Sequence, residues 1–330
     1  KNQNLTYLAS IRRSYLQLLF SAIDLPIRPN YWDFQYKVTY KPDNKSTLTF
    51  LGVAAIDQFN FGTIKTPTQD KIYTLFEVPF LEQKSYTLGA SYRRVLNKGY
   101  MQIAISRNAL DNLSEKYDFN DESNPNNLRN KFTSLETENK LRAEVNKTIN
   151  GWKLSYGGVA QYLQYDATSN IRRRAAVGTQ PEDRFLYAGN INFFRFGAFV
   201  QAGKKLMQNR LGINAGLRTD VNTFTNDGMN AGNAFSPRIA FSYVLANKWT
   251  LNATVGRYAK MPAYTILGFR DNAGNLINKN NNYITNSHYV LGVEYLPKAT
   301  TRFTLEGFYK KYSHVPVTAK DDISINNLGA

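Results

Sequence analysis

Apolar and polar residues alternate with a period of two along most of the chain. In residues 31–41, YWDFQYKVTYK, apolar and aromatic side chains occupy the even positions from Phe34 to Tyr40, and Gln, Lys and Thr occupy the odd ones. This alternation predicts β-strands with one apolar face and one polar face. The same alternation recurs in residues 86–93, 152–157, 238–243, 249–255 and 288–295.

Short and long connections alternate along the whole chain. The short ones are residues 41–45, 96–99, 148–151, 204–209, 245–248 and 297–300. The long ones are residues 20–30, 60–83, 108–130, 166–183, 222–234, 259–283 and the segment from 313 onward. About thirteen strands of roughly ten or more residues therefore run up and down, which is the length that a tilted strand needs to cross a bilayer. The predicted fold is all-β, a transmembrane up-and-down antiparallel barrel with its short turns at one end.

Two other all-β architectures are less consistent with this pattern. A β-sandwich gives no reason to sort short and long connections to opposite ends. A β-propeller would also repeat hairpins, but the chain lacks the repeated Trp-Asp or Gly-His pattern of propeller blades.

Aromatic residues of the apolar face concentrate near the short turns. Amphipathic rings suit the headgroup level of a membrane, and aliphatic side chains suit its middle. We therefore expect the apolar face to contact lipid and the other face to line a hydrated lumen. The predicted girdle consists of Tyr40, Tyr92, Trp152, Tyr243, Trp249, Tyr295 and Phe303.

Composition restricts the class of protein further. The 330 residues are 42% hydrophobic and 20% charged, which is typical of a folded chain, and the longest apolar run, residues 50–56, is too short for a membrane helix. Without cysteine there is neither a disulfide nor a thiolate metal site. The net charge of +16 is compatible with nucleic acid, anionic lipid or an anionic solute as a binding partner. From the sequence, the charged residues are expected to be scattered. No nucleic-acid-binding motif accompanies them, which disfavours nucleic acid.

Two segments depart from the regular strand pattern. Residues 14–23, SYLQLLFSAI, carry apolar residues at helical spacing after a first strand, which predicts a short helix with Ser14 as its cap. Near Thr137 and Asn139 the pattern is polar on both faces, which indicates strands that extend beyond the bilayer.

Three long segments resemble successive barrel hairpins of TonB-dependent outer-membrane receptors: residues 196–224, 235–269 and 286–317. Their elements include Phe-Ser-Pro-Arg at 235–238 and Gly-Arg-Tyr at 256–258 before Met261-Pro262. Residues 11–20, IRRSYLQLLF, are similar to the early barrel segment of the branch that carries an N-terminal carboxypeptidase-regulatory-like domain.

The resemblance implies a partial barrel over residues 1–330, with about 13 of 22 strands, short periplasmic turns, long extracellular loops, and the plug and last strands outside this chain. It implies a Gram-negative outer-membrane transporter that imports a scarce solute, such as a siderophore, glycan, peptide or cobalamin. The implied partners are outer-membrane lipid, the solute, the TonB-ExbB-ExbD complex through an N-terminal region, and in some receptors a surface lipoprotein. A non-energised pore, or a scaffold component of an export or assembly complex, is the alternative.

No catalytic or cofactor site is expected. An outer-membrane enzyme would need a Ser, a His and a polar partner on one face of adjacent strands, and the pattern assembles no such group. His288 and His314 stand outside any metal-binding spacing. The acidic loop 117–127 offers oxygen ligands of the type that calcium takes, although it lacks the spacing of the twelve-residue calcium loop. This weak calcium candidate consists of Asp118, Asn120, Asp121 and Glu122.

Solute contacts are expected where long loops meet the upper lumen, because aromatic and Arg side chains there can hold a solute partly out of water. The predicted ligand-binding set is Arg257, Tyr258, Lys260, Tyr264 and Arg270. Arg172, Arg173 and Arg174 form a second basic group, for which phosphate of surface lipid is a further possible contact. The alternative for both groups is a solvated loop, or a lumen charge paired with the plug.

Overall fold

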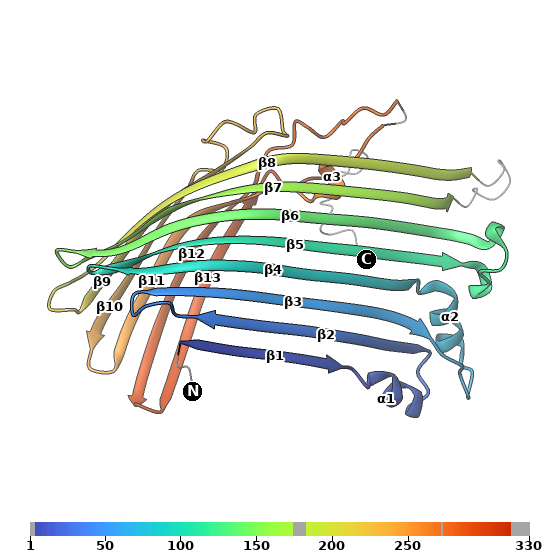
Figure 1. Ribbon diagram of the computed structural model, residues 1–330, viewed down its shortest axis with the longest axis horizontal. Helices are drawn as coiled ribbons and strands as arrows, with labels where there is room; N and C mark the ends of the chain where they lie inside the picture. The colour runs from blue at the N-terminus through green and yellow to red at the C-terminus, as the bar shows by residue number, and fades with distance from the viewer. Residues whose placement is uncertain (1–3, 174–182, 272, 318–330) are drawn as a thin grey trace.

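The computed structural model describes residues 4–173, 183–271 and 273–317, which form one curved antiparallel sheet (Figure 1). In this described part of the chain, thirteen strands lie in sequence order, and each pairs with its neighbours in the chain, as the alternating connections predict. The strands are β1 (Leu5–Arg13), β2 (Ile27–Tyr40), β3 (Ser46–Phe61), β4 (Phe80–Leu96), β5 (Gly99–Tyr117), β6 (Leu128–Ile149), β7 (Trp152–Arg173), β8 (Asp183–Leu206), β9 (Leu211–Asn222), β10 (Ser236–Ala246), β11 (Trp249–Lys260), β12 (Ile284–Lys298) and β13 (Thr301–Ser313).

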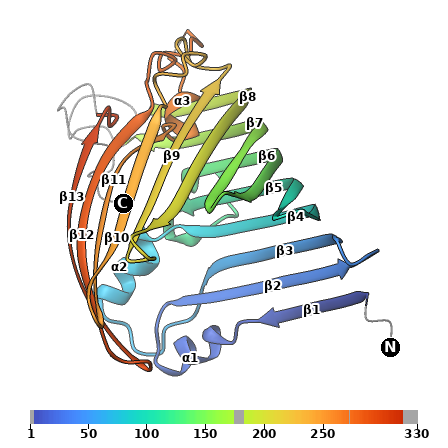
Figure 2. The same ribbon diagram turned by 90° about the vertical axis from the view of Figure 1, so that its left-hand side faces the viewer.

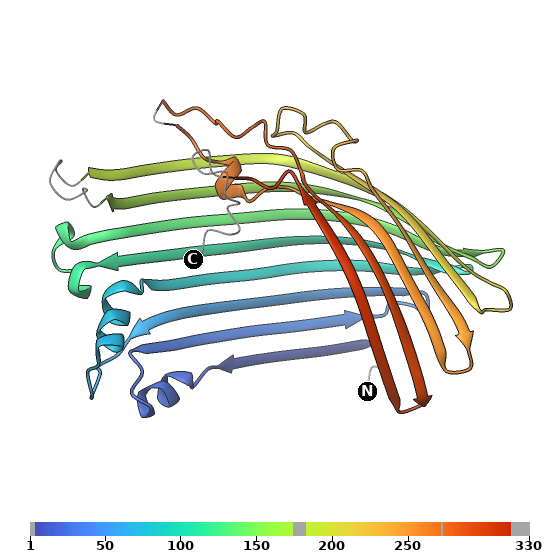
Figure 3. The same cartoon turned by 180° about the vertical axis from the view of Figure 1, so that it is seen from behind.

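The sheet curls into part of a cylinder. Figure 2 shows β9 to β13 rising steeply opposite β1 to β4, and Figure 3 shows the same curve from behind. The short turns gather at one end and the helices and long loops at the other (Figure 1). The turn between β6 and β7 has only two residues, Asn150 and Gly151, and both have positive φ, at 50° and 79°. Such a turn matches the right-handed twist of the two strands.

Within the described residues, three α-helices lie in the long connections: α1 (Leu16–Ala22), α2 (Gln69–Glu77) and α3 (Tyr264–Leu267). Two 3-10 turns follow β5, at Asp118–Asn120 and Pro125–Asn127. Helix α1 lies within the predicted residues 14–23, but its N-cap residue is Tyr15 and not Ser14. Ser14 Oγ still accepts the N–H of Leu16 at 3.1 Å, one residue before the cap position. No helix in the described part of the chain has both the length and the apolar character needed to cross a membrane.

Four strands are longer than the sequence pattern predicts. The loops predicted over residues 108–130 and 166–183 are therefore shorter in the structure. Strand β5 continues to Tyr117 and β6 begins at Leu128, and β7 continues to Arg173 and β8 begins at Asp183. The outer parts of these strands keep their backbone pairing although their outward face becomes mostly polar. Side-chain alternation marks where a strand meets lipid, whereas backbone pairing continues beyond it into water.

All seven predicted girdle residues lie on one face of the sheet, which we call the outward face. Directly paired residues of antiparallel strands share a face. Tyr40 pairs with Leu48 and Leu48 with Tyr92, and on the far side Trp249 pairs with Tyr295 and Tyr295 with Phe303. Trp152 and Trp249 are 42% and 41% exposed, so no protein layer within the described residues covers them.

The outward apolar band has a second aromatic row at its other edge. On β7 the band runs from Trp152 to Tyr162, about 33 Å along the strand and about 25 Å high once the strand is tilted. Beyond it, outward positions become polar, for example Arg107 and Asn139, which share a 3.0 Å hydrogen bond. This height matches the apolar band of a membrane barrel. The second row consists of Tyr86, Tyr162, Phe194, Tyr289 and Tyr309.

Part of the positive charge is clustered at the short-turn end of the sheet, whereas the sequence suggests that it is scattered. Thirteen Lys and Arg residues, with Asp43 as the one carboxylate among them, lie in or beside the short turns, and we call them the basic rim. Sequence order hides this clustering because the six turns are far apart along the chain but adjacent at one end of the sheet. The basic rim lies in residues 41–45, 93–98, 147–153, 204–210, 248 and 298–302.

Candidate functional site

The opposite, inward face carries a groove of about 420 Å³ between β6 and β11. Guanidinium groups lie over aromatic rings in it: Arg142 is 5.3 Å from the ring of Phe199, and Arg238 is 4.4 Å from that of Tyr258. The other inward residues that line it include Gln201, Asn214, Arg218, Ser236, Ala240 and Thr254.

Carboxylates on the same strands orient two of the three arginines of the groove. Glu144 accepts from Arg142 at 2.6 Å, and Asp220 accepts from Arg218 at 2.7 Å. Arg238 stacks on Tyr258, whose ring lies 4.7 Å from His288. Flat cationic groups held against aromatic rings suit a planar or anionic solute group.

Two long loops fold over the inward face of β7 and β8. We call them the roof: residues 223–235 between β9 and β10, and residues 261–271 with 273–283 between β11 and β12. Figure 2 shows α3 of the second loop inside the curve of the sheet. Together with the strands below, the roof forms the one hydrophobic core cluster of the described residues. Its members are Leu163, Tyr165, Ala167, Ile191, Phe193, Phe224, Ala234, Met261, Leu267 and Tyr283.

Asn222 fastens the two loops to the end of β9. Its side chain is fully buried, and its Oδ1 accepts the N–H groups of Phe224 at 3.0 Å and Thr225 at 2.9 Å. Its Nδ2 donates to the hydroxyl of Tyr283 at 3.2 Å, at the end of the other loop. One amide side chain therefore holds the start of one loop against the end of the second.

A second fastening joins the roof to β8. Tyr187 donates its hydroxyl to the carbonyl of Gly268 at 2.5 Å and stacks on Phe269 with ring centroids 5.7 Å apart. Arg270 donates to the carbonyl of Asn190 at 3.3 Å. Burial raises the pKa of Tyr264, in α3, to about 12. The roof is packed like a protein interior and is not a solvated loop.

The structure distributes the predicted ligand-binding set over four environments. Tyr258 faces the inward groove, whereas Arg257, one residue earlier, is on the outward register and donates to the carbonyl of Phe235 at 2.9 Å. Lys260 is exposed at the end of β11. Tyr264 and Arg270 belong to the roof, so the five side chains do not converge on one point, and their role in binding stays a prediction.

Sequence reasoning missed most of the groove residues. Arg142, Phe199, Arg218 and Arg238 come from four strands and reach the same height only through the register of the sheet. The alternation of apolar and polar residues predicts that these four side chains face inward. How high each one lies along the barrel depends instead on the stagger between neighbouring strands. Turn lengths and β-bulges set this stagger, and it cannot be derived from the alternation of apolar and polar residues.

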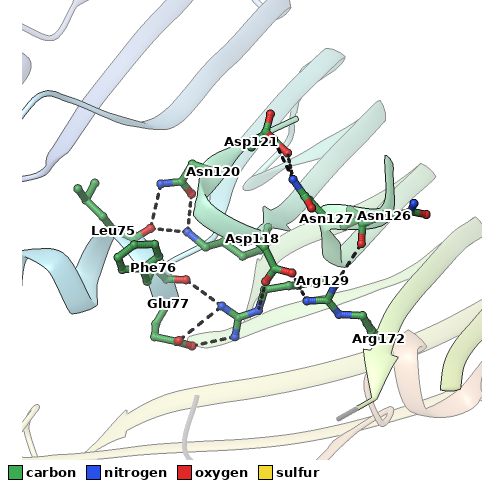
Figure 4. A network of polar contacts seen from close by, with 12 residues as sticks. Leu75, Phe76, Glu77, Asp118, Asn120, Asp121, Asn126, Asn127, Arg129 and Arg172 are labelled. Carbon is green, nitrogen blue, oxygen red and sulfur yellow. Dashed lines mark hydrogen bonds and ion pairs between the residues drawn. The ribbon is translucent and has the colours of Figure 1, made fainter. Parts of the chain in front are cut away.

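The predicted calcium loop is part of a network of ion pairs and hydrogen bonds (Figure 4). Asp118 pairs with Arg172 and lies 3.7 Å from Arg129, which also pairs with Glu77 of α2 at 3.1 Å. Asn120 Oδ1 accepts from the ammonium of Lys116 at 2.6 Å.

Much of the oxygen capacity of this loop is already used. The carboxylate of Asp121 accepts from Ser123 at 2.6 Å and from Asn127 at 2.9 Å, and Glu122 is exposed. Within residues 4–173, 183–271 and 273–317, no three His, Asp or Glu side chains gather as metal ligands. Calcium binding stays an untested prediction. Of the second basic group, Arg172 joins this network, whereas Arg174 and the side chain of Arg173 lie outside the described residues.

An outward apolar band between aromatic rows and an inward polar face define the wall of an outer-membrane β-barrel. A family model described as "TonB dependent receptor-like, beta-barrel" matches residues 27–330. The chain belongs to this family of TonB-dependent outer-membrane receptors.

Solved structures share the fold at low sequence identity. A mutant of the ferric enterobactin receptor PfeA of Pseudomonas aeruginosa is 17% identical with a TM-score of 0.65, covering 94% of this chain and 49% of that one. FpvA of P. aeruginosa, bound to a heterologous pyoverdine, is 12% identical with a TM-score of 0.67, covering 94% and 44%. The copper transporter OprC is 14% identical with a TM-score of 0.65, covering 92% and 48%. The chain thus spans about half the length of these receptors, and no curated protein matches it.

Proposed function

We propose that this chain forms part of the barrel wall of a TonB-dependent transporter that imports a scarce solute across the outer membrane. The remaining strands close the barrel, and a plug occupies the lumen on the inward face. Pulling on the plug through the TonB-ExbB-ExbD complex opens the path. The chain itself supplies the membrane seal, the inward groove and the loops that receive the solute.

The observation that carries this proposal is the packed roof on the inward face. A passive pore needs an unobstructed lumen, whereas here ten buried residues hold two loops against the inside of β7 and β8. The roof narrows the entrance at the long-loop end, directly beyond the groove with its arginine and aromatic pairs. This arrangement suits capture of a solute more than free diffusion.

The solute class follows from the groove. Arg142 and Arg238 present guanidinium faces, and Phe199 and Tyr258 present rings. A solute with anionic or planar groups, as in a metal chelate, fits this lining better than a neutral glycan. PfeA in complex with enterobactin and FpvA with pyoverdine-iron are receptors of the same fold that bind chelates.

The test uses the intact receptor in isogenic cells with active or inactive TonB. Uptake is measured for a defined panel: ferric catecholate and hydroxamate complexes labelled with radioactive iron, labelled oligosaccharides, peptides and cobalamin. We expect uptake of at least one chelate to require both the receptor and active TonB. Uptake that persists without TonB, or no receptor-dependent uptake of any panel member, would contradict the proposal.

A liposome-swelling assay separates the importer from the alternative of a non-energised pore. Purified intact receptor in vesicles should admit a neutral trisaccharide no faster than protein-free vesicles do, because the lumen is obstructed. Rapid swelling would favour the pore.

A further inference from the structure

The basic rim has far fewer ion pairs than the opposite end of the sheet. Of its thirteen cationic side chains, only Arg302 forms an ion pair within the described residues, with Glu294. At the long-loop end, Lys71, Arg129, Lys131 and Arg172 all pair with carboxylates. The carboxylate of the rim, Asp43, accepts the N–H groups of Lys45 and Ser46, each at 2.7 Å. The rim therefore has an excess of positive charge that the described residues do not neutralise.

Part of this charge lies directly on the outward aromatic girdle. Lys204 Nζ is 5.1 Å from the ring centroid of Trp152, and Arg94 donates to the hydroxyl of Tyr92 at 3.3 Å. Arg210 is 5.6 Å from the ring of Tyr243. Girdle rings mark the headgroup level of the membrane, so these cations lie at the depth of lipid phosphates.

We propose that the outward half of the basic rim binds the phosphodiester headgroups of anionic phospholipids in the periplasmic leaflet. The short turns lie at the periplasmic end of this barrel family. The headgroup region packs against the flat face of the aromatic ring, and an adjacent ammonium or guanidinium group neutralises the phosphate. Arg94, Lys147 and Lys204 belong to the outward register, one on each of three strands.

Zwitterionic lipid is a weaker occupant because its own ammonium group offsets the phosphate. Anionic phospholipid leaves a net negative charge for each headgroup, which complements an unpaired cation. The charge of the rim thus selects between two lipids with identical acyl chains. This inference depends on the orientation of the barrel and not on import, so a failed uptake assay leaves it standing.

The rim supplies a matched control from the same turns. Arg94, Lys147 and Lys204 face outward, whereas their near neighbours Arg93, Lys153 and Lys205 belong to the inward register. The test variant is Arg94→Gln with Lys147→Gln and Lys204→Gln. The control is Arg93→Gln with Lys153→Gln and Lys205→Gln. Each triple removes the same charge from the same end of the sheet.

Retention of dioleoyl phosphatidylglycerol is measured by native mass spectrometry of the intact, detergent-purified receptor. Phosphatidylethanolamine with the same acyl chains and soluble glycerophosphoglycerol serve as the comparison probes. The mobility of the unheated protein on a detergent gel confirms that each variant is folded. Folded wild type and the inward triple should retain phosphatidylglycerol, and the folded outward triple should lose about tenfold or more of this retention.

Three results would overturn the inference. The first is equal retention by the two triples, which would mean either no site or a general effect of charge. The second is equal retention of phosphatidylethanolamine and phosphatidylglycerol. The third is binding of glycerophosphoglycerol as tight as that of the lipid, which would indicate a site for soluble phosphate. If the outward triple does not fold, the single variant Lys204→Gln against Lys205→Gln provides the same comparison.

Discussion

The two ends of the sheet use the same residue types in opposite ways. At the short-turn end, aromatic rings are exposed, with Trp249 at 41% and Phe303 at 61%, and cations are mostly unpaired. At the long-loop end, Tyr283 and Phe224 are 6% and 8% exposed beneath the roof, and cations pair with carboxylates. The difference follows from the solvent: rings next to lipid need no protein cover, whereas rings next to water are stable only when they pack together.

The largest expected effect is loss of packing in the roof. Leu267 is fully buried, so Leu267→Ala should lower the free energy of opening the roof by about 2 to 5 kcal/mol. Hydrogen exchange of residues 261–283 in the intact receptor measures this opening. The control is Leu305→Ala, at an outward position that is 79% exposed. Equal acceleration of exchange in both variants would show that the roof is not held by its own core.

The next effect tests the outward face. Ala253 lies near the middle of the outward band on β11, and Asn252 beside it faces inward. Ala253→Arg should destabilise the folded barrel in vesicles by about 2 to 4 kcal/mol, because a guanidinium at mid-bilayer loses its hydration. Asn252→Arg should cost much less, and urea titration of the intact receptor measures both. A larger loss for Asn252→Arg would reverse the assignment of faces.

A smaller effect is expected at the fastening between the two loops. Asn222→Ala leaves the N–H groups of Phe224 and Thr225 and the hydroxyl of Tyr283 without their partner, which should cost about 1 to 3 kcal/mol of roof stability. Limited proteolysis of the roof in the intact receptor reports this loss. Met229→Ala, at a site of the same loop that is 63% exposed, should leave the cleavage rate unchanged. Similar cleavage rates of wild type and Asn222→Ala would show that Asn222 does not hold the two loops together.

The smallest effect is a pH dependence between α1 and α2. The hydrogen bond from Lys71, with those from the backbone of Lys65 and Thr66, holds the pKa of Asp24 well below its ordinary value. A depressed pKa contributes stability that is present above the unfolded-state pKa and declines as the pH falls below about 4. Exchange of residues 69–77 should therefore accelerate below about pH 4 in wild type. In Asp24→Asn, exchange of these residues should already be faster at pH 7 and should respond less to acid. Identical pH profiles of exchange in wild type and variant would show that the pair of Asp24 and Lys71 does not stabilise this region.

Alternation and connection lengths were enough to predict the thirteen strands, the apolar face and the girdle, because both are local properties of the chain. Helix α1 was also predicted, whereas α2 was missed although Thr68 accepts from the N–H of Lys71 at 3.4 Å as its cap. The signal for α2 was present, in a threonine cap followed by apolar residues at helical spacing. It was obscured by the assignment of residues 60–83 as one long loop.

The inward groove and the roof cluster were not predictable in the same way. Each assembles residues that are distant in sequence: Asn222 meets Tyr283, and Arg142 lies beside Phe199. The stagger of the strands and the folding of the loops bring these residues together, and neither produces a periodic pattern in the sequence. The basic rim is different, because the prediction that all short turns lie at one end already implies that the thirteen charges in and beside these turns gather there. The expectation of scattered charge came from the order of the charges along the chain alone and did not use this consequence.

The central claim is that the outward face contacts lipid and the inward face encloses water. This chain contains no cysteine of its own, so Leu291→Cys, on the outward register, or Asn252→Cys, on the inward one, introduces a single labelling site into it. A nitroxide is attached there in the intact receptor after any cysteine outside this chain has been replaced by alanine. In vesicles, we predict that collision with molecular oxygen relaxes the label at position 291, and that collision with a water-soluble nickel chelate relaxes the label at position 252. Equal access of the nickel chelate to both labels, or the reverse preference, would contradict the account.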